Sequence, residues 1–148
     1  MLKTEFKAMT KQWLLSKGFK KNLNDGGYFT YALSKFEVVF AFYKNRFDEI
    51  FHMEVGFGLE GFPATYGKAY LDAPKKYWNH VEMADGSKGI EKGSFYYEKW
   101  DKEDYSLFLE EVYDTHIKPY IEKGVKHLKA LTKERRIHPD VVEAIKKM

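Results

Sequence analysis

The chain has 148 residues, of which 44% are hydrophobic and 32% are charged, and its formal net charge is +3. This size and balance are typical of one folded domain, 1–148, and they exclude a disordered chain or one with an apolar run long enough to span a bilayer. Because the sequence contains no cysteine, disulfides, thiolate catalysis and cysteine-ligated metals are excluded as well.

The first residues predict an amphipathic helix. Charge interrupts this segment every few positions, so we expect no signal peptide and a cytoplasmic protein. Apolar residues recur at helical spacing in the order Leu2, Phe6, Met9 and Trp13. A second, solvent-exposed stripe carries Lys3, Lys7 and Lys11. Gly18 followed by Phe19 predicts the end of the helix, with the glycine in the left-handed conformation.

Residues 28–59 hold 10 of the 26 aromatic residues and alternate between apolar and other residues with a period of two. This alternation predicts an antiparallel meander of three strands with one apolar face. If Ser34 and Lys35 form a two-residue turn, Phe29 lies opposite Phe40 and the apolar faces coincide. A longer loop stays open, because Ser-Lys is not a preferred pair for a tight hairpin turn. We expect Phe40 and Val55 to be among the most buried residues.

The other face of the meander is the candidate ligand- or partner-binding surface. It carries Glu37, His52 and Glu54, with Tyr28 and Tyr43 nearby. Small residues lie among them and would allow close approach by another molecule: Ala32, Ala41, Gly56 and Gly58. The alternative interpretation is that one of the protein's own helices covers this face.

Two His-x-Glu motifs, 52–54 and 80–82, each place an imidazole and a carboxylate on the same side of a strand. Together they would offer ligands to a divalent metal, and His80 and Glu82 join the candidate binding residues. The pattern also arises from simple polar–apolar alternation, and no known metal motif accompanies it, so we predict no metal and no cofactor. Segments 77–83 and 94–99 are predicted to form a second hairpin.

From Asp101, a predicted N-cap, the period becomes helical. An apolar face follows, made of Phe108, Leu109, Val112, Ile117, Ile121, Val125, Leu128 and Leu131. Pro119 is expected to bend or split this helix because it lacks a backbone donor. A short final helix opens at 138–140 and carries Val141, Val142 and Ile145.

Charge is divided unevenly along the chain. Residues 1–27 carry 6 basic and 2 acidic side chains, 118–148 carry 9 and 4, and the middle, 28–117, carries 10 and 16. The basic ends could attract nucleic acid, although solvated lysine faces are the ordinary alternative. We do not expect nucleic acid to be the partner, since the chain has only three arginines for bidentate phosphate contacts. No nucleotide-binding or nucleophile motif is present, and we assign no catalytic residue.

The first predicted helix ends in SKGFKKN, and the chain continues with YFTYAL, FEVVFAF and YWNHVE and finally with THIKPYIEKGVKHLKAL. This succession resembles a group of small bacterial domains of unknown function. Members of that group carry a similar GFKK end to the first helix. The resemblance covers most of residues 1–132 and implies a helix, an antiparallel sheet and a closing helical segment. Relatives of this kind lie near toxin–immunity or phage-derived genes, which implies a protein-binding role.

The sequence therefore predicts an α+β domain with an N-terminal helix, an antiparallel sheet of four or five strands and C-terminal helices packed on the sheet. We expect a non-enzymatic, immunity-like protein that binds another protein through a sheet face or edge. The alternative is a small-molecule binder or an unrecognised enzyme that uses the His and Glu groups beside an aromatic cleft of Tyr66, Tyr70, Tyr77 and Trp78. An electrostatic nucleic-acid binder is the third possibility.

Overall fold

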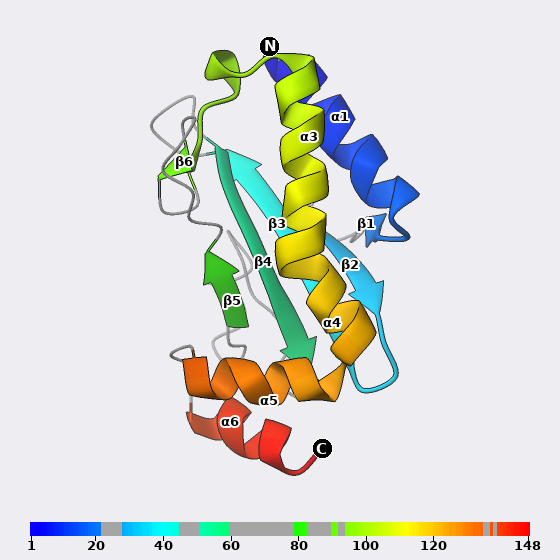
Figure 1. The fold of residues 1–148 in the computed structure, drawn as a ribbon, viewed down its shortest axis with the longest axis vertical. Coiled ribbons are helices and arrows are strands. Elements are labelled where there is room, and N and C mark those ends of the chain that lie inside the picture. Colours follow the sequence, from blue (N-terminus) through cyan, green and yellow to red (C-terminus); the bar gives the residue numbers. More distant parts are fainter. Residues whose placement is uncertain are drawn as a thin grey trace.

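The structure is a computed structural model that describes residues 1–21, 28–44, 51–59, 79–82, 90–91, 94–134, 137 and 139–148. At positions 28, 43, 52, 79–82, 90–91 and 94 the description covers the backbone alone. Within these ranges the chain has the predicted α+β architecture: an N-terminal helix, an antiparallel sheet and C-terminal helices (Figure 1).

The sheet has the strand order β1-β2-β3-β4-β7-β6, and β5 also pairs with β4. Its strands are β1 (Lys20–Lys21), β2 (Tyr28–Ala32), β3 (Phe36–Lys44), β4 (Phe51–Leu59), β5 (Asn79–Glu82), β6 (Ile90–Glu91) and β7 (Ser94–Phe95). The predicted sheet of four or five strands is confirmed in β2 to β5, and the three other strands, of two residues each, extend it. The helices are α1 (Lys3–Ser16), α3 (Lys102–Val112), α4 (Lys118–Lys123), α5 (Val125–Glu134) and α6 (Pro139–Lys146).

The meander has the predicted register. Phe29 pairs with Phe40, and the Leu33 N–H donates to the Phe36 carbonyl at 2.8 Å, so Ser34 and Lys35 form the two-residue turn. Across the next pair of strands Phe40 lies opposite Val55, and both side chains are completely buried. The alternation of apolar and polar residues therefore placed both faces correctly.

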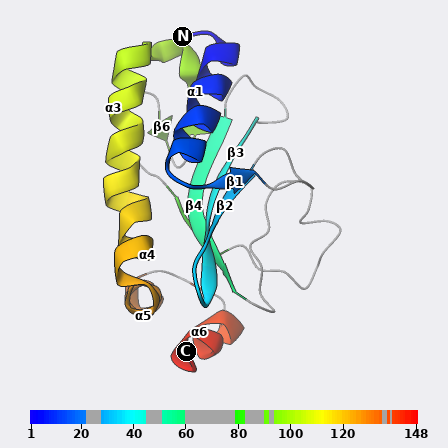
Figure 2. The ribbon, with the colours of Figure 1, turned by 90° about the vertical axis from the view of Figure 1, so that its right-hand side faces the viewer.

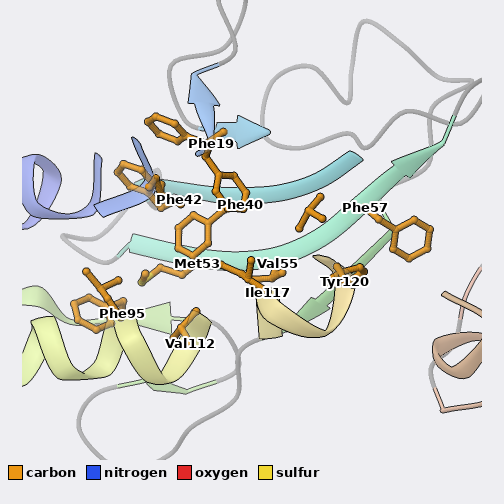
Figure 3. Close-up of a cluster of buried hydrophobic side chains, with 14 of the residues drawn as sticks. Phe19, Phe40, Phe42, Met53, Val55, Phe57, Phe95, Val112, Ile117 and Tyr120 are labelled. Atoms are coloured by element: carbon orange, nitrogen blue, oxygen red, sulfur yellow. The ribbon is translucent and has the colours of Figure 1, made fainter. Parts of the chain in front are cut away.

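One face of the sheet carries the hydrophobic core, and α1, α3 and α4 cover it (Figures 1 and 2). The Trp13 ring of α1 meets Phe40 edge-on at 5.8 Å between centroids, and Tyr120 of α4 lies 6.3 Å from Phe36. Figure 3 shows Phe40 and Val55 of the sheet in one cluster with residues of the helical layer. This packing removes the aromatic face of the meander from water, which is the dominant stabilising contribution in such a fold.

Helix α1 ends as predicted, but its buried stripe differs from the prediction. Gly18 has φ of 92°, and the Phe19 N–H donates to the Leu14 carbonyl at 3.0 Å, which is the Schellman arrangement. The buried residues are Phe6, Thr10 and Leu14. The placement of Leu2 on the core face is wrong: it precedes the helix as its N-cap and is 67% exposed. In the predicted lysine stripe Lys7 and Lys11 are exposed, whereas Lys3 is half-buried.

A buried pair of hydroxyl groups joins α1 to α3. The Thr10 hydroxyl donates to the Phe6 carbonyl at 2.7 Å and also lies within hydrogen-bond distance of the Tyr105 hydroxyl. Because the single proton of Thr10 is used on the carbonyl, the Tyr105 hydroxyl is the donor in the second bond. Both residues are completely buried, and burial raises the pKa of the Tyr105 phenol.

The C-terminal helical segment is broken twice. As predicted, the helix splits at Pro119, where a π-helical turn (Tyr113–Ile117) accommodates the missing backbone donor before α4 begins. The second break, at Gly124, was not predicted. Gly124 has φ of 56° and ψ of −129°, a combination that side-chain-bearing residues rarely adopt. The change of direction lets α5 run across the axis of α4 (Figure 1).

The predicted hairpin between segments 77–83 and 94–99 is wrong. Within the described residues, β5 and β7 each pair with β4, at Glu54 to Phe57 and at Phe51 to His52 respectively, and β7 forms its hairpin with β6. Tyr97–Lys99 is a short 3-10 turn instead of a strand. The physical reason is that the second edge of β4 offers unpaired backbone groups to both segments, one after the other along the strand.

We predict that Phe40→Ala lowers the free energy of unfolding by about 3–5 kcal/mol, because it removes a completely buried ring and leaves a cavity. Denaturant unfolding followed by circular dichroism measures the loss. Leu107→Ala is the control, since Leu107 is 70% exposed, and its effect should stay within about 0.5 kcal/mol. An unchanged midpoint for Phe40→Ala would contradict the packing described above.

The hydroxyl pair generates a second prediction. Thr10→Val leaves the buried Tyr105 hydroxyl without its acceptor and should cost about 1–3 kcal/mol. Tyr105→Phe leaves Thr10 bonded to the Phe6 carbonyl and should cost less, about 0.5–1.5 kcal/mol. Adding Tyr105→Phe to Thr10→Val should therefore restore part of the lost stability in a double-mutant cycle. Strictly additive losses would show that the two hydroxyl groups do not interact.

Candidate functional sites

The backbone register places all seven candidate positions on one face of the sheet, opposite the face that α1, α3 and α4 cover. They are Tyr28 on β2, Glu37 and Tyr43 on β3, His52 and Glu54 on β4, and His80 and Glu82 on β5. Tyr28 pairs with Ala41, which pairs with Glu54, which pairs with Glu82. Because residues two apart in a strand share a face, the other positions follow from these pairs.

The centre of this face is buried. Val39 and Ala41 have no exposed surface, although within the described chain α1, α3 and α4 lie on the other face and α5 and α6 lie beyond one end of the sheet (Figure 2). The alternative interpretation required one of the protein's own helices to cover this face, and none of the described helices does so. Tyr66, Tyr70, Tyr77 and Trp78, the predicted aromatic cleft, lie outside the described residues.

Glu37 lies away from the other charged candidates. Its neighbours across the strands are Ala32 and Gly58, and it is four residues from Ala41, hence about 13 Å along the strand from the row of Glu54. The side chain is half-buried, and this desolvation raises the pKa of its carboxyl. Glu37 is thus not part of a common cluster with the two His-x-Glu motifs.

The two His-x-Glu motifs lie on adjacent strands, but their histidine positions are four residues apart along the strand direction, about 13 Å. Glu54 lies directly opposite Glu82, and His80 lies opposite Gly56, so His80 is the diagonal neighbour of Glu54. His52 precedes Glu54 by two residues on the same face and pairs with Tyr43 and Ser94. Among the side chains that the structure describes, no group of three metal-ligating residues occurs. Of the four motif residues, only Glu54 has a described side chain.

A second surface, which the sequence analysis missed, lies on the outward side of α3 and the first residues of the π-helical turn that follows it. We call it the acidic face of α3, and it consists of Glu103, Leu107, Glu110, Glu111 and Asp114. All five residues are exposed, and Leu107, with 70% of its surface exposed, lies among the four acidic residues. The helical spacing of 103, 107, 110, 111 and 114 was the available signal, since it runs opposite the buried stripe of Tyr105, Phe108, Leu109 and Val112.

Trp13 of α1 and Lys17, the C-cap residue of the same helix, hold the acidic face in place. Trp13 Nε1 donates to Glu110 Oε1 at 3.0 Å, and Lys17 Nζ donates to Glu110 Oε2 at 3.0 Å. The Lys17 bond lowers the pKa of the Glu110 carboxyl, partial desolvation raises it, and the Trp13 bond lowers it further. Lys17 also lies 4.4 Å above the Tyr113 ring, a cation–π contact. Glu110 therefore stays charged and fixes the orientation of α3 against α1.

The described edge of the sheet at β1 is protected. Strand β1 has two residues, Lys20 and Lys21, and both are exposed. A short, lysine-bearing edge strand is a device that discourages pairing with another chain. Strand addition at this edge, one form of the predicted binding mode, is thus disfavoured.

Comparisons with protein-family models, with curated proteins and with solved structures give no match to this chain. The resemblance to small bacterial domains therefore stays a prediction. Among the described residues no helix is both long and apolar enough to cross a membrane.

The desolvated carboxyl of Glu37 gives a pH-dependent prediction. A raised pKa in the folded state means that the charged form opposes folding, so Glu37→Gln should raise the melting temperature at pH 7. The advantage should shrink as the pH falls through the raised pKa of folded Glu37, and it should be lost below about 4.3, the ordinary pKa of an unfolded glutamate, because the carboxyl is then neutral in both states. Melting curves between pH 3 and 7 measure it, with the exposed Glu111→Gln as control. A Glu37→Gln variant that is less stable than the parent at pH 7 would contradict the assignment.

Proposed function

We propose that this protein is a non-enzymatic, immunity-like binding protein that engages a basic protein partner through the acidic face of α3. The observation that carries the proposal is the position of Leu107. It is the most exposed of the large hydrophobic residues among those the structure describes, and it is surrounded by carboxylates.

This composition is that of an interface anchor. Protein interfaces place an apolar residue at the centre, where it is desolvated, and charged residues at the rim, where they steer the partner. Residues 101–117 contain six acidic side chains and one lysine, so the complementary partner has a basic surface. The same charge opposes nucleic acid at this face.

The acidic face is also rigid before any partner arrives. Four buried residues fix α3 to the core, and the Thr10–Tyr105 and Trp13–Glu110 hydrogen bonds tie it to α1. A preorganised surface loses little conformational entropy on binding. The sheet offers less to a partner protein, because the centre of the face opposite the helical layer is buried and the edge strand β1 is short and carries two exposed lysines.

The test is a quantitative pull-down from a lysate of the source organism, followed by titration calorimetry with the captured protein in purified form. Leu107→Ala should raise the dissociation constant at least about 10-fold, as expected for an anchor residue. Glu103→Lys combined with Glu111→Lys should weaken binding similarly, and the parent's affinity should fall as sodium chloride rises, because charge attraction is screened.

Two matched variants serve as controls. Leu15→Ala removes a 48% exposed leucine from α1, and Lys7→Glu combined with Lys11→Glu reverses two exposed charges on the same helix. Both should leave the affinity unchanged. The proposal fails if no protein is retained, or if the retained protein binds the Leu107 and Glu103/Glu111 variants as tightly as the parent.

A further inference from the structure

We propose that the acidic face of α3 binds a second copy of this chain, through a basic stripe on α5 of that copy, while no foreign partner occupies it. The basic stripe of α5 consists of Lys126, Lys129, Ala130 and Lys133, and all four residues are exposed. This inference rests on the proposed function, because it names what covers the same acidic face before a foreign partner arrives.

The residues of the basic stripe lie on one side of their helix. Lys126, Lys129 and Lys133 are separated by three and four residues, which is the spacing of neighbours on a helix surface, and Ala130 lies between them. The buried side of α5 faces the other way. The stripe is therefore a solvent-facing surface with one small apolar residue among three positive charges.

The charge of the stripe has little compensation within its own chain. Among the described residues neither Lys126 nor Lys133 forms a salt bridge, and Lys129 Nζ donates to the Met148 carbonyl at 3.4 Å. The exposed Glu134 borders the stripe and leaves it net positive. Like charges three and four residues apart destabilise a helix, so a negatively charged surface that covers the stripe offsets a cost that the free chain carries.

The two faces have complementary patterns. In the acidic face, Leu107 has one glutamate four residues before it, Glu103, and another three residues after it, Glu110. In the basic stripe, Ala130 has a lysine at each of the same two spacings. Two helices laid side by side thus place the leucine on the alanine and the carboxylates beside the ammonium groups. The small alanine leaves room for the leucine at an ordinary distance between helix axes.

The contact has to form between two chains. The break at Gly124 turns α5 across the axis of α4, so α5 does not run alongside α3 of its own chain (Figure 1). Because the acidic face and the stripe are different surfaces, the contact is head-to-tail. Two short helix faces bury less than the about 1,200 Å² of a standard interface, so we expect weak association that a larger basic partner displaces.

The test is sedimentation equilibrium of the full chain without an affinity tag. Between about 10 micromolar and about 1 millimolar protein, the range for weak complexes, the weight-average mass should rise above that of the monomer. Raising sodium chloride from about 0.02 M to about 0.5 M should reverse the rise, because salt screens charge attraction.

Two neutralised variants separate the faces. Glu103→Gln combined with Glu111→Gln alters the acidic face, and Lys126→Gln combined with Lys133→Gln alters the stripe. Each variant alone should associate at least about 10-fold more weakly than the parent. An equimolar mixture retains one intact acidic face and one intact stripe, so it should form a one-to-one dimer and nothing larger.

A matched control keeps the charge change but moves it to another helix. Lys7→Gln combined with Lys11→Gln on α1 alters the net charge as much as the stripe variant does, and both lysines are exposed. It should associate like the parent. Glutamine is as good a helix former as lysine and glutamate, so all these variants should keep their helices.

The inference is overturned if the parent stays monomeric, if either variant associates as strongly as the parent, or if the mixture forms no dimer. The stripe variant keeps its acidic face and should bind the captured basic protein as tightly as the parent does. Capture of a basic protein by a parent that does not self-associate would overturn this inference alone. Self-association through the two faces without any captured protein would overturn the proposed function alone.

Discussion

The register between β3 and β4 is the constraint on which the other features depend. Nine residue pairs run from Phe36 with Leu59 to Lys44 with Phe51. A slip by one residue would turn the aromatic side chains of one strand away from the helices and its carboxylates toward them, so the pairing allows no intermediate arrangement. The helical layer packs on one side of the sheet, and Glu37 and Glu54 lie on the other, because this one pairing separates two chemically different faces.

The contacts between α1 and α3 fix the position of α3 relative to the sheet. Phe6 and Trp13 reach the sheet from α1, while Thr10 and Trp13 hold Tyr105 and Glu110 of α3. Helix α3 is therefore fixed both in depth and in rotation, and Leu107 is kept on the outward side. The buried stripe of α3 lies on the opposite side of the helix from Leu107, so the same packing keeps this leucine exposed.

Local patterns in the sequence were sufficient for several local features of the structure. The strand faces followed from alternation, the end of α1 from Gly18 and Phe19, and the split of the helix from Pro119. Features that depend on distant partners were not predictable. The shared edge of β4 for β5 and β7 has no turn signal, and Thr10 is a polar residue in a buried stripe whose partner is 95 residues away. The break at Gly124 was not predictable either, because a lone glycine is compatible with a helical pattern.

The same separation of 95 residues between Thr10 and Tyr105 governs the order of assembly. The strands of the meander are contiguous in the chain and can pair early, whereas docking of α3 must wait for a long loop to close. During synthesis the aromatic face emerges from the ribosome before α3 and α4 exist to cover it, and such exposed apolar surface promotes association with other chains. A fragment that ends before Lys102 would keep the sheet with only α1 to cover its apolar face and would aggregate in an expression trial.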